Sequence, residues 1–70
     1  MTNIKKYMII FQDKSHDPIE FKLSENQDET FEILETIDNH PFHGAMNSLE
    51  GVQNVIRFSL KNDSIIIKKL

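Results

Sequence analysis

The sequence predicts an α+β domain of two layers: an antiparallel β-sheet of about four strands with one long helix packed on one face, in the order ββαββ. Two patterns predict this class. Near both ends of the chain, apolar residues recur at every second position, which is the period of a β-strand. Between them, apolar residues recur at every third or fourth position, which is the period of an α-helix. The 70 residues contain no linker and no internal repeat, so one domain over 1–70 is expected.

The first strand is predicted over residues 6–11, where both faces are apolar. One face carries Tyr7, Ile9 and Phe11, and the other carries Met8 and Ile10. A strand that is apolar on both faces is typical of a position covered on two sides. We therefore expect a second layer over this strand, supplied either by the segment 46–55 or by a second copy of the chain in a homodimer.

The second strand is predicted over residues 19–23, after a polar turn at 12–18. Asp13, Ser15 and Asp17 favour a turn there, because their side chains can hydrogen-bond to the nearby backbone. Pro18 favours it because proline fixes φ. Apolar residues then alternate with Glu20 and Lys22, as they do in a half-buried strand. The two strands should form a hairpin.

A long helix is predicted from Ser24 to about Asp38. Ser24 and Gln27 have the spacing of a capping box, and acids follow where the helix dipole favours them. The apolar stripe of this helix would consist of Phe31, Ile33, Leu34 and Ile37. Pro41 disfavours helical geometry in the residue before it, so the helix should end at Asp38 or Asn39.

Residues 41–54 allow two interpretations. Apolar residues in the second half keep helical spacing, and Asn47 with Glu50 has the spacing of a cap, so we favour a short helical turn. The alternative is a strand over 42–49 with a bulge or turn at Gly51, since glycine weakens a helix by about 1 kcal/mol relative to alanine.

A terminal hairpin is predicted for the last part of the chain. Ile56, Phe58 and Leu60 alternate with polar residues, which favours a strand over 55–60. Residues 61–63 are of types that favour a turn, and an isoleucine-rich strand is predicted after them over 64–70.

Charge divides the chain into two parts. Residues 13–50 contain ten acids and two bases, a net of −8, whereas the other residues contain one acid and six bases, a net of +5. Such an acidic segment either keeps a protein soluble or meets a basic partner. Six acids fall in the predicted helix without a base among them, and we take them as the candidate partner-binding residues: Glu25, Asp28, Glu29, Glu32, Glu35 and Asp38.

The function predicted from this surface is that of a small acidic protein-interaction module, which binds and inhibits or modulates a larger, nucleic-acid-handling protein with a basic surface. Phage or mobile-element inhibitors of host defence nucleases, such as anti-CRISPR proteins, and immunity or antitoxin-type proteins act in this way as classes. The chain resembles them in size and charge and shares no motif with them.

The alternative is a small dimeric nucleic-acid-binding regulator that uses its basic strands, because contacts to phosphate supply most non-specific affinity. Its candidate contacts are Lys5, Lys6, Arg57, Lys61, Lys68 and Lys69. A single arginine and a net charge of −3 count against direct binding of nucleic acid.

Neither an enzyme nor a metal or cofactor site is expected. His40 and His43, with Asp38 or His16, fall short of the four ligands of a structural zinc site. Ser15, His16 and Asp17 are the residue types of a catalytic triad, but they are adjacent in sequence. A catalytic triad is formed by residues that the fold brings together in space. The longest uncharged apolar stretch has five residues where a membrane span needs roughly 17 to 25, and no signal peptide is recognised. A cytoplasmic location without a membrane contact is therefore expected.

Overall fold

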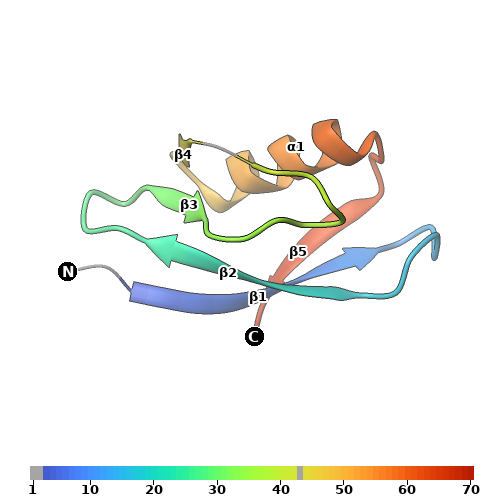
Figure 1. The fold of residues 1–70 in the computed structure, drawn as a ribbon, viewed down its shortest axis with the longest axis horizontal. Coiled ribbons are helices and arrows are strands. Elements are labelled where there is room, and N and C mark those ends of the chain that lie inside the picture. The colour runs from blue at the N-terminus through green and yellow to red at the C-terminus, as the bar shows by residue number, and fades with distance from the viewer. Residues whose placement is uncertain (1–2, 43) are drawn as a thin grey trace.

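The computed structural model describes residues 3–42 and 44–70 and has an α+β fold, in which one antiparallel sheet carries one helix (Figure 1). In chain order the elements are β1 Asn3–Phe11, β2 Ile19–Glu25, β3 Phe31–Ile33, β4 Ala45–Met46, α1 Leu49–Leu60 and β5 Ile65–Lys69. The strand order in the sheet is β4-β3-β2-β1-β5. The predicted class is thus confirmed, whereas the number of strands and the ββαββ order are not.

Three strands lie where the alternation of apolar residues predicts them. β1 is the longest strand and pairs with β2 on one side and with β5 on the other. Tyr7 lies opposite Phe21, and Phe11 lies opposite Ile65, so the buried apolar residues of all three strands share one face. This face is called the inner face below.

The long helix predicted over 24–38 is wrong. β2 continues through Ser24, and a turn leads into β3 instead of a helix. Phe31 and Ile33 both contact the core, while Glu32 between them is exposed. The spacing of these apolar residues fits a strand as well as a helix, because residues two apart share one face of a strand.

The polar residues that resemble a helix start belong to the turn between β2 and β3. The Asn26 amide donates to the Thr30 carbonyl at 2.9 Å, and the Asp28 carboxylate accepts from the Thr30 hydroxyl at 2.6 Å. Glu29 has a φ of 65°, in the left-handed region that breaks a right-handed helix. Side chains of this kind cap turns as readily as helix ends, which explains the wrong assignment.

The helix lies later in the chain, at Leu49–Leu60, so the strand predicted over 55–60 is wrong. The favoured short helical turn is right in kind, but Ser48 rather than Asn47 caps it, with its hydroxyl accepting from the Gly51 amide at 3.0 Å. The alternative strand over 42–49 survives only as the two-residue β4. Within the described parts of the chain, no helix is long and apolar enough to cross a membrane.

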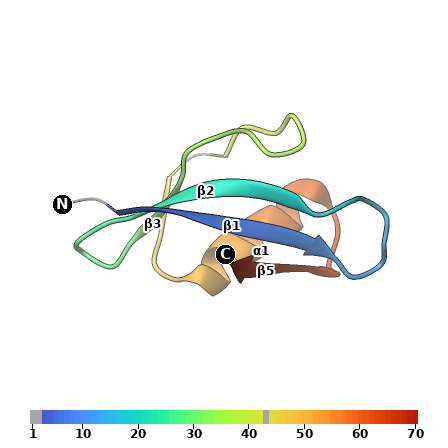
Figure 2. The same ribbon diagram turned by 90° about the horizontal axis from the view of Figure 1, so that it is seen from below.

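The core lies between the inner face of the sheet, α1 and the segment 34–42. Nearly all of its buried side chains come from alternate strand positions or from one stripe of α1: Tyr7, Ile9, Phe11, Phe21, Leu23, Ile33, Ile37, Val52, Ile56 and Ile65. The opposite, outer face of the sheet is not covered by α1 (Figure 2). The expected covering of that face by 46–55 is therefore wrong, because this segment packs on the inner side.

One edge of the sheet is closed by side chains of α1. β5 is an edge strand, and its outward backbone groups would otherwise be free to pair with another strand. The Arg57 guanidinium donates through Nε to the Ile65 carbonyl at 2.8 Å. The Gln53 side chain accepts from the Ile67 amide at 3.0 Å. The helix thus satisfies part of the edge that the sheet leaves open.

Candidate functional site

The six predicted partner-binding acids are not on a helix. They follow the chain from the end of β2, through the turn and β3, into the segment 34–42. Glu25 and Asp28 accept hydrogen bonds from other side chains, Glu35 accepts one from a backbone amide, and all of the six but Glu25 are exposed. The structure therefore divides the six acids into two groups with different roles.

Glu25 belongs to a cluster at the start of the sheet. Its carboxylate accepts a hydrogen bond from the Tyr7 hydroxyl and lies 3.4 Å from the Lys5 ammonium. The hydrogen bond from Tyr7, followed by that from Lys5, lowers the pKa of Glu25. The same contacts would be lost if Glu25 were used to bind a partner, so we assign this acid to the fold.

Tyr7 should titrate well above an ordinary tyrosine. Burial, and then the hydrogen bond to Glu25, raises the pKa of its phenol to about 12. A raised pKa contributes stability that is fully present below the unfolded value of about 10 and is lost as the pH rises through the folded value. Because Tyr7 is the one tyrosine in the sequence, absorbance near 295 nm follows this group alone.

We expect that titration to show a midpoint near 12, accompanied by a loss of unfolding free energy above pH 10. Tyr7→Phe should lack the tyrosinate signal and lose less stability over the same interval. A midpoint near 10 in the folded protein would contradict the buried, hydrogen-bonded phenol.

Asp28 has a local role in the turn. Its carboxylate accepts from the hydroxyl and the amide of Thr30, at 2.6 and 3.3 Å. These hydrogen bonds, that of the hydroxyl first, lower the pKa of Asp28. Asp28 thus holds the turn that presents its neighbour Glu29.

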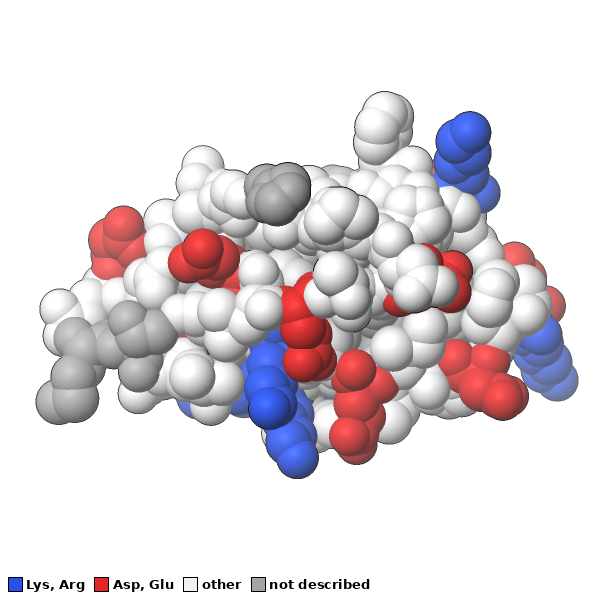
Figure 3. Space-filling model, in the orientation of Figure 1, with Lys and Arg blue, Asp and Glu red and all other residues white. Residues whose placement is uncertain are grey.

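The four remaining acids form an exposed acidic band: Glu29, Glu32, Glu35 and Asp38. Over residues 3–42 and 44–70, the ion pair within 4.0 Å is Lys5–Glu25, so no acid of the band is neutralised in this way. Glu35 does accept from the backbone amide of Lys22 at 3.1 Å. Acidic side chains cross the side of the molecule that carries β3 and the following segment (Figure 3).

A groove lies next to one end of the acidic band. It has a volume of about 460 Å³ and separates the β2–β3 turn from the start of α1. Glu29 is at its rim, and the half-buried side chains of Phe31 and Leu49 supply apolar surface. The other lining residues are Glu25, Asn26, Thr30, Asn47 and Ser48. A carboxylate beside apolar surface suits a side chain that carries both an apolar stem and a positive charge.

Basic residues gather elsewhere on the sheet. Five of the seven lysines lie on β1, β2 and β5, which are neighbours: Lys5, Lys6, Lys22, Lys68 and Lys69. Lys6 and Lys22 are directly opposite each other. The proximity of Lys5 lowers the pKa of Lys69. The basic segments at the two ends of the chain come together because β1 pairs with β5. The acidic segment between them forms β3 and the chain after it, on the other side of β2.

The histidines do not form a metal site among the residues that the structure describes, where no group of three His, Cys, Asp or Glu could hold an ion. His40 is exposed, and its Nδ1 lies 2.9 Å from the Asp38 carbonyl oxygen in a tight turn. His16 packs against Phe11, with ring centroids 4.8 Å apart. His43 lies outside the described residues.

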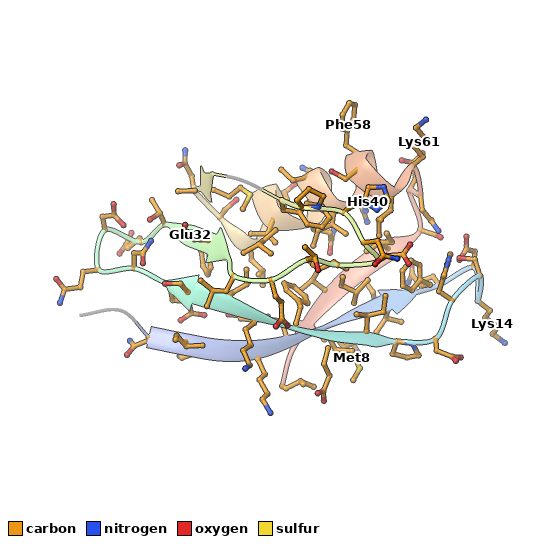
Figure 4. All side chains as sticks on the ribbon, in the orientation of Figure 1. Met8, Lys14, Glu32, His40, Phe58 and Lys61 are labelled. Carbon is orange, nitrogen blue, oxygen red and sulfur yellow. The ribbon has the colours of Figure 1, made fainter. Side chains whose placement is uncertain are left out.

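Phe58 is a surface feature that the sequence does not reveal under the strand interpretation of 55–60. It is 86% exposed and projects from α1 away from the sheet (Figure 4). Extending the helical stripe of Leu49, Val52 and Ile56 would have placed Phe58 off the buried side. A large aromatic side chain on a rigid helix is a typical anchor in protein interfaces.

Comparison of the chain with family models, with curated proteins and with solved structures finds no match.

Proposed function

We propose that this protein is a small protein-interaction module that binds a larger protein with a basic surface and inhibits or modulates it. The observation that carries this proposal is the acidic band, whose four carboxylates are exposed and have no ion-pair partner in the described parts of the chain. A nucleic-acid-handling protein, such as a host defence nuclease, has a basic surface of the required kind.

Charge complementarity supports this proposal through the rate of association. Carboxylates that are not neutralised internally project a negative potential that steers a basic partner toward them. Glu29 and Glu32 have no hydrogen-bond partner for their side chains among the described contacts, so binding would break nothing at these two positions. Such steering accelerates association by about 10-fold to 1000-fold and weakens as salt is added.

The groove beside Glu29 supports a specific contact in addition to general attraction. Apolar surface from Phe31 and Leu49 can bury the stem of an inserted lysine or arginine while Glu29 pairs with its charge. We expect the partner to present a basic residue on a protruding segment at this point. Inhibition would then be steric, since the bound module covers the basic surface.

The test begins with affinity capture from the source cells, using tagged wild-type protein as bait, and continues with the purified pair. Glu29→Lys combined with Glu32→Lys should abolish capture and lower the association rate at low salt by about tenfold or more. The matched control is Asp17→Lys with Asp63→Lys, two exposed acids outside the band that change the total charge by the same amount. Equal capture by both variants would contradict the acidic band as the binding surface.

A second candidate function is direct binding of nucleic acid through the sheet lysines. The observation that favours it is that five lysines lie on the neighbouring strands β1, β2 and β5, three of them, Lys6, Lys22 and Lys68, on the outer face. The same capture experiment distinguishes the two candidates. Recovery of nucleic acid that Lys6→Glu with Lys22→Glu abolishes, and that salt removes steeply, would favour this second function.

A further inference from the structure

The outer face of the sheet is apolar along its centre although no part of the described chain lies over it. Met8 points away from α1 (Figure 4), and Ile10 and Ile66 lie opposite each other on the same face, all three half-exposed. Ile4 and Leu70 lie on the same face and are 63% and 59% exposed, but Lys6 separates Ile4 from Met8, and Lys68 separates Leu70 from Ile66. An exposed apolar cluster such as that of Met8, Ile10 and Ile66 on a small protein favours an interface.

The edges of the sheet are poorly suited to self-association. Arg57 and Gln53 already occupy the Ile65 carbonyl and the Ile67 amide on β5. At the other edge, β4 has only two residues. An added strand would find part of the β5 edge occupied and only a short strand at the other edge, so contact through the outer face is favoured over pairing at an edge.

One row of side chains across the outer face is complementary to itself. Met8 lies opposite Glu20 on β2 and opposite Lys68 on β5, so the row carries a negative, an apolar and a positive side chain in order. With strands about 5 Å apart, Glu20 and Lys68 lie on either side of Met8 and about 10 Å from each other. A two-fold axis parallel to β1 through Met8 would place each Glu20 over the Lys68 of a second copy.

We propose that the outer face binds a second copy of this chain in an isologous, face-to-face dimer about that axis. The two Met8 side chains meet at the centre, and two Glu20–Lys68 pairs flank them. Ile4 and Ile10 meet their own copies along the axis, in the manner of two stacked sheets. This inference rests on different residues from those of the acidic band, although two members of the band border the outer face: Glu32 lies opposite Ser24, and Glu35 lies beside Lys22.

Lys6 limits the strength of this dimer. It lies on β1 between Ile4 and Met8, so it approaches its own copy near the axis and must direct its ammonium group toward solvent. Four residue positions of β1 and the strands beside it make a small interface, at the low end of the sizes found in specific complexes. The dimer is therefore a weak one, and measurements should extend from about 10 µM to about 1 mM.

The test is sedimentation equilibrium on the wild-type chain and on charge-reversal variants at low salt. Glu20 and Lys68 are both exposed, so each reversal should leave the circular dichroism spectrum unchanged. Glu20→Lys alone and Lys68→Glu alone should each raise the dimer dissociation constant by at least about tenfold, because both pairs become repulsive. The double variant should restore the wild-type value. Lys6→Met should strengthen the dimer.

The decisive sample is an equimolar mixture of the two single variants. In that heterodimer, each reversed position faces an opposite charge, so the mixture should dimerise more tightly than either variant does alone. A structural effect within one chain could not produce this rescue. A wild-type chain that stays monomeric over the whole concentration range, or a mixture that is no more associated than its components, would overturn the proposal. Loss of association with Met8→Glu in the wild-type background is expected as well.

Discussion

Replacement of Ile9 by alanine is expected to lower the free energy of unfolding by about 3 kcal/mol. Ile9 lies in the middle of the longest strand and is fully buried, and it shares the core with residues of α1 and β5. Truncation removes apolar contact and leaves a cavity that a well-packed core fills only in part. The free energy of unfolding of a small domain is about 5 to 15 kcal/mol in total, so this variant should be close to unfolding at raised temperature.

The matched control for this prediction is the adjacent residue. Ile10→Ala makes the same chemical change on the half-exposed outer face and should cost less than about 1 kcal/mol in dilute solution. Urea denaturation followed by circular dichroism gives both values. Equal losses for the two variants would show that the inner and outer faces of β1 are wrongly assigned.

Loss of the Arg57 side chain has the second-largest expected effect. Arg57→Ala should lower the unfolding free energy by about 2 kcal/mol, because it removes a charge-assisted hydrogen bond to the Ile65 carbonyl and the packing of a long side chain. Gln53→Ala should cost about 1 kcal/mol by freeing the Ile67 amide. The double variant leaves the β5 edge open, so light scattering should report aggregation that the wild-type chain resists.

Phe58→Ala and Asn54→Ala serve as controls on the same helix. Both residues are exposed, and neither contacts the β5 backbone in the described structure. Denaturation midpoints close to the wild-type value are expected for them. If Arg57→Ala behaved like these controls and stayed soluble at high concentration, the side chains of α1 would not be what protects the edge.

The strands that could be predicted are those whose pattern has a single explanation. In β2, apolar residues alternate with Glu20 and Lys22, and no helical stripe passes through these positions. In β5 a run of isoleucines follows turn residues. Pattern and structure agree there because the burial of alternate side chains dominates all other local preferences.

The helix could not be placed, because two segments carry patterns with two explanations. Phe31, Ile33 and Ile37 fit a helical stripe, yet the left-handed Glu29 and the hydrogen bonds of Asp28 make the preceding residues a turn. In α1, alternation from Ile56 to Leu60 resembles a strand, although tertiary packing selects the helical stripe. The local sequence does not show which of the two patterns will be buried against the core.

Part of the candidate site can be predicted from the sequence. The distribution of charge predicts an acidic surface, and four of the six acids assigned to it form the exposed acidic band: Glu29, Glu32, Glu35 and Asp38. The internal role of Glu25 depends on a contact with Tyr7 that only the pairing of β1 with β2 creates. The groove beside Glu29 likewise joins segments far apart in the sequence, so no local pattern could show it.

The pairing of β5 with β1 also governs how the chain reaches its folded state. Phe11 finds Ile65 and Tyr7 finds Lys69, so nearly the entire chain must be closed into a loop before these contacts form. Closing a long loop costs entropy that local contacts do not repay, and proteins with such distant pairings fold slowly for their size. The hairpin of β1 and β2 can form early, while the core remains open until the last strand arrives. Apolar side chains of β1 stay exposed to other molecules during that interval, which makes folding, rather than the folded state, the stage at which this protein is most prone to aggregate.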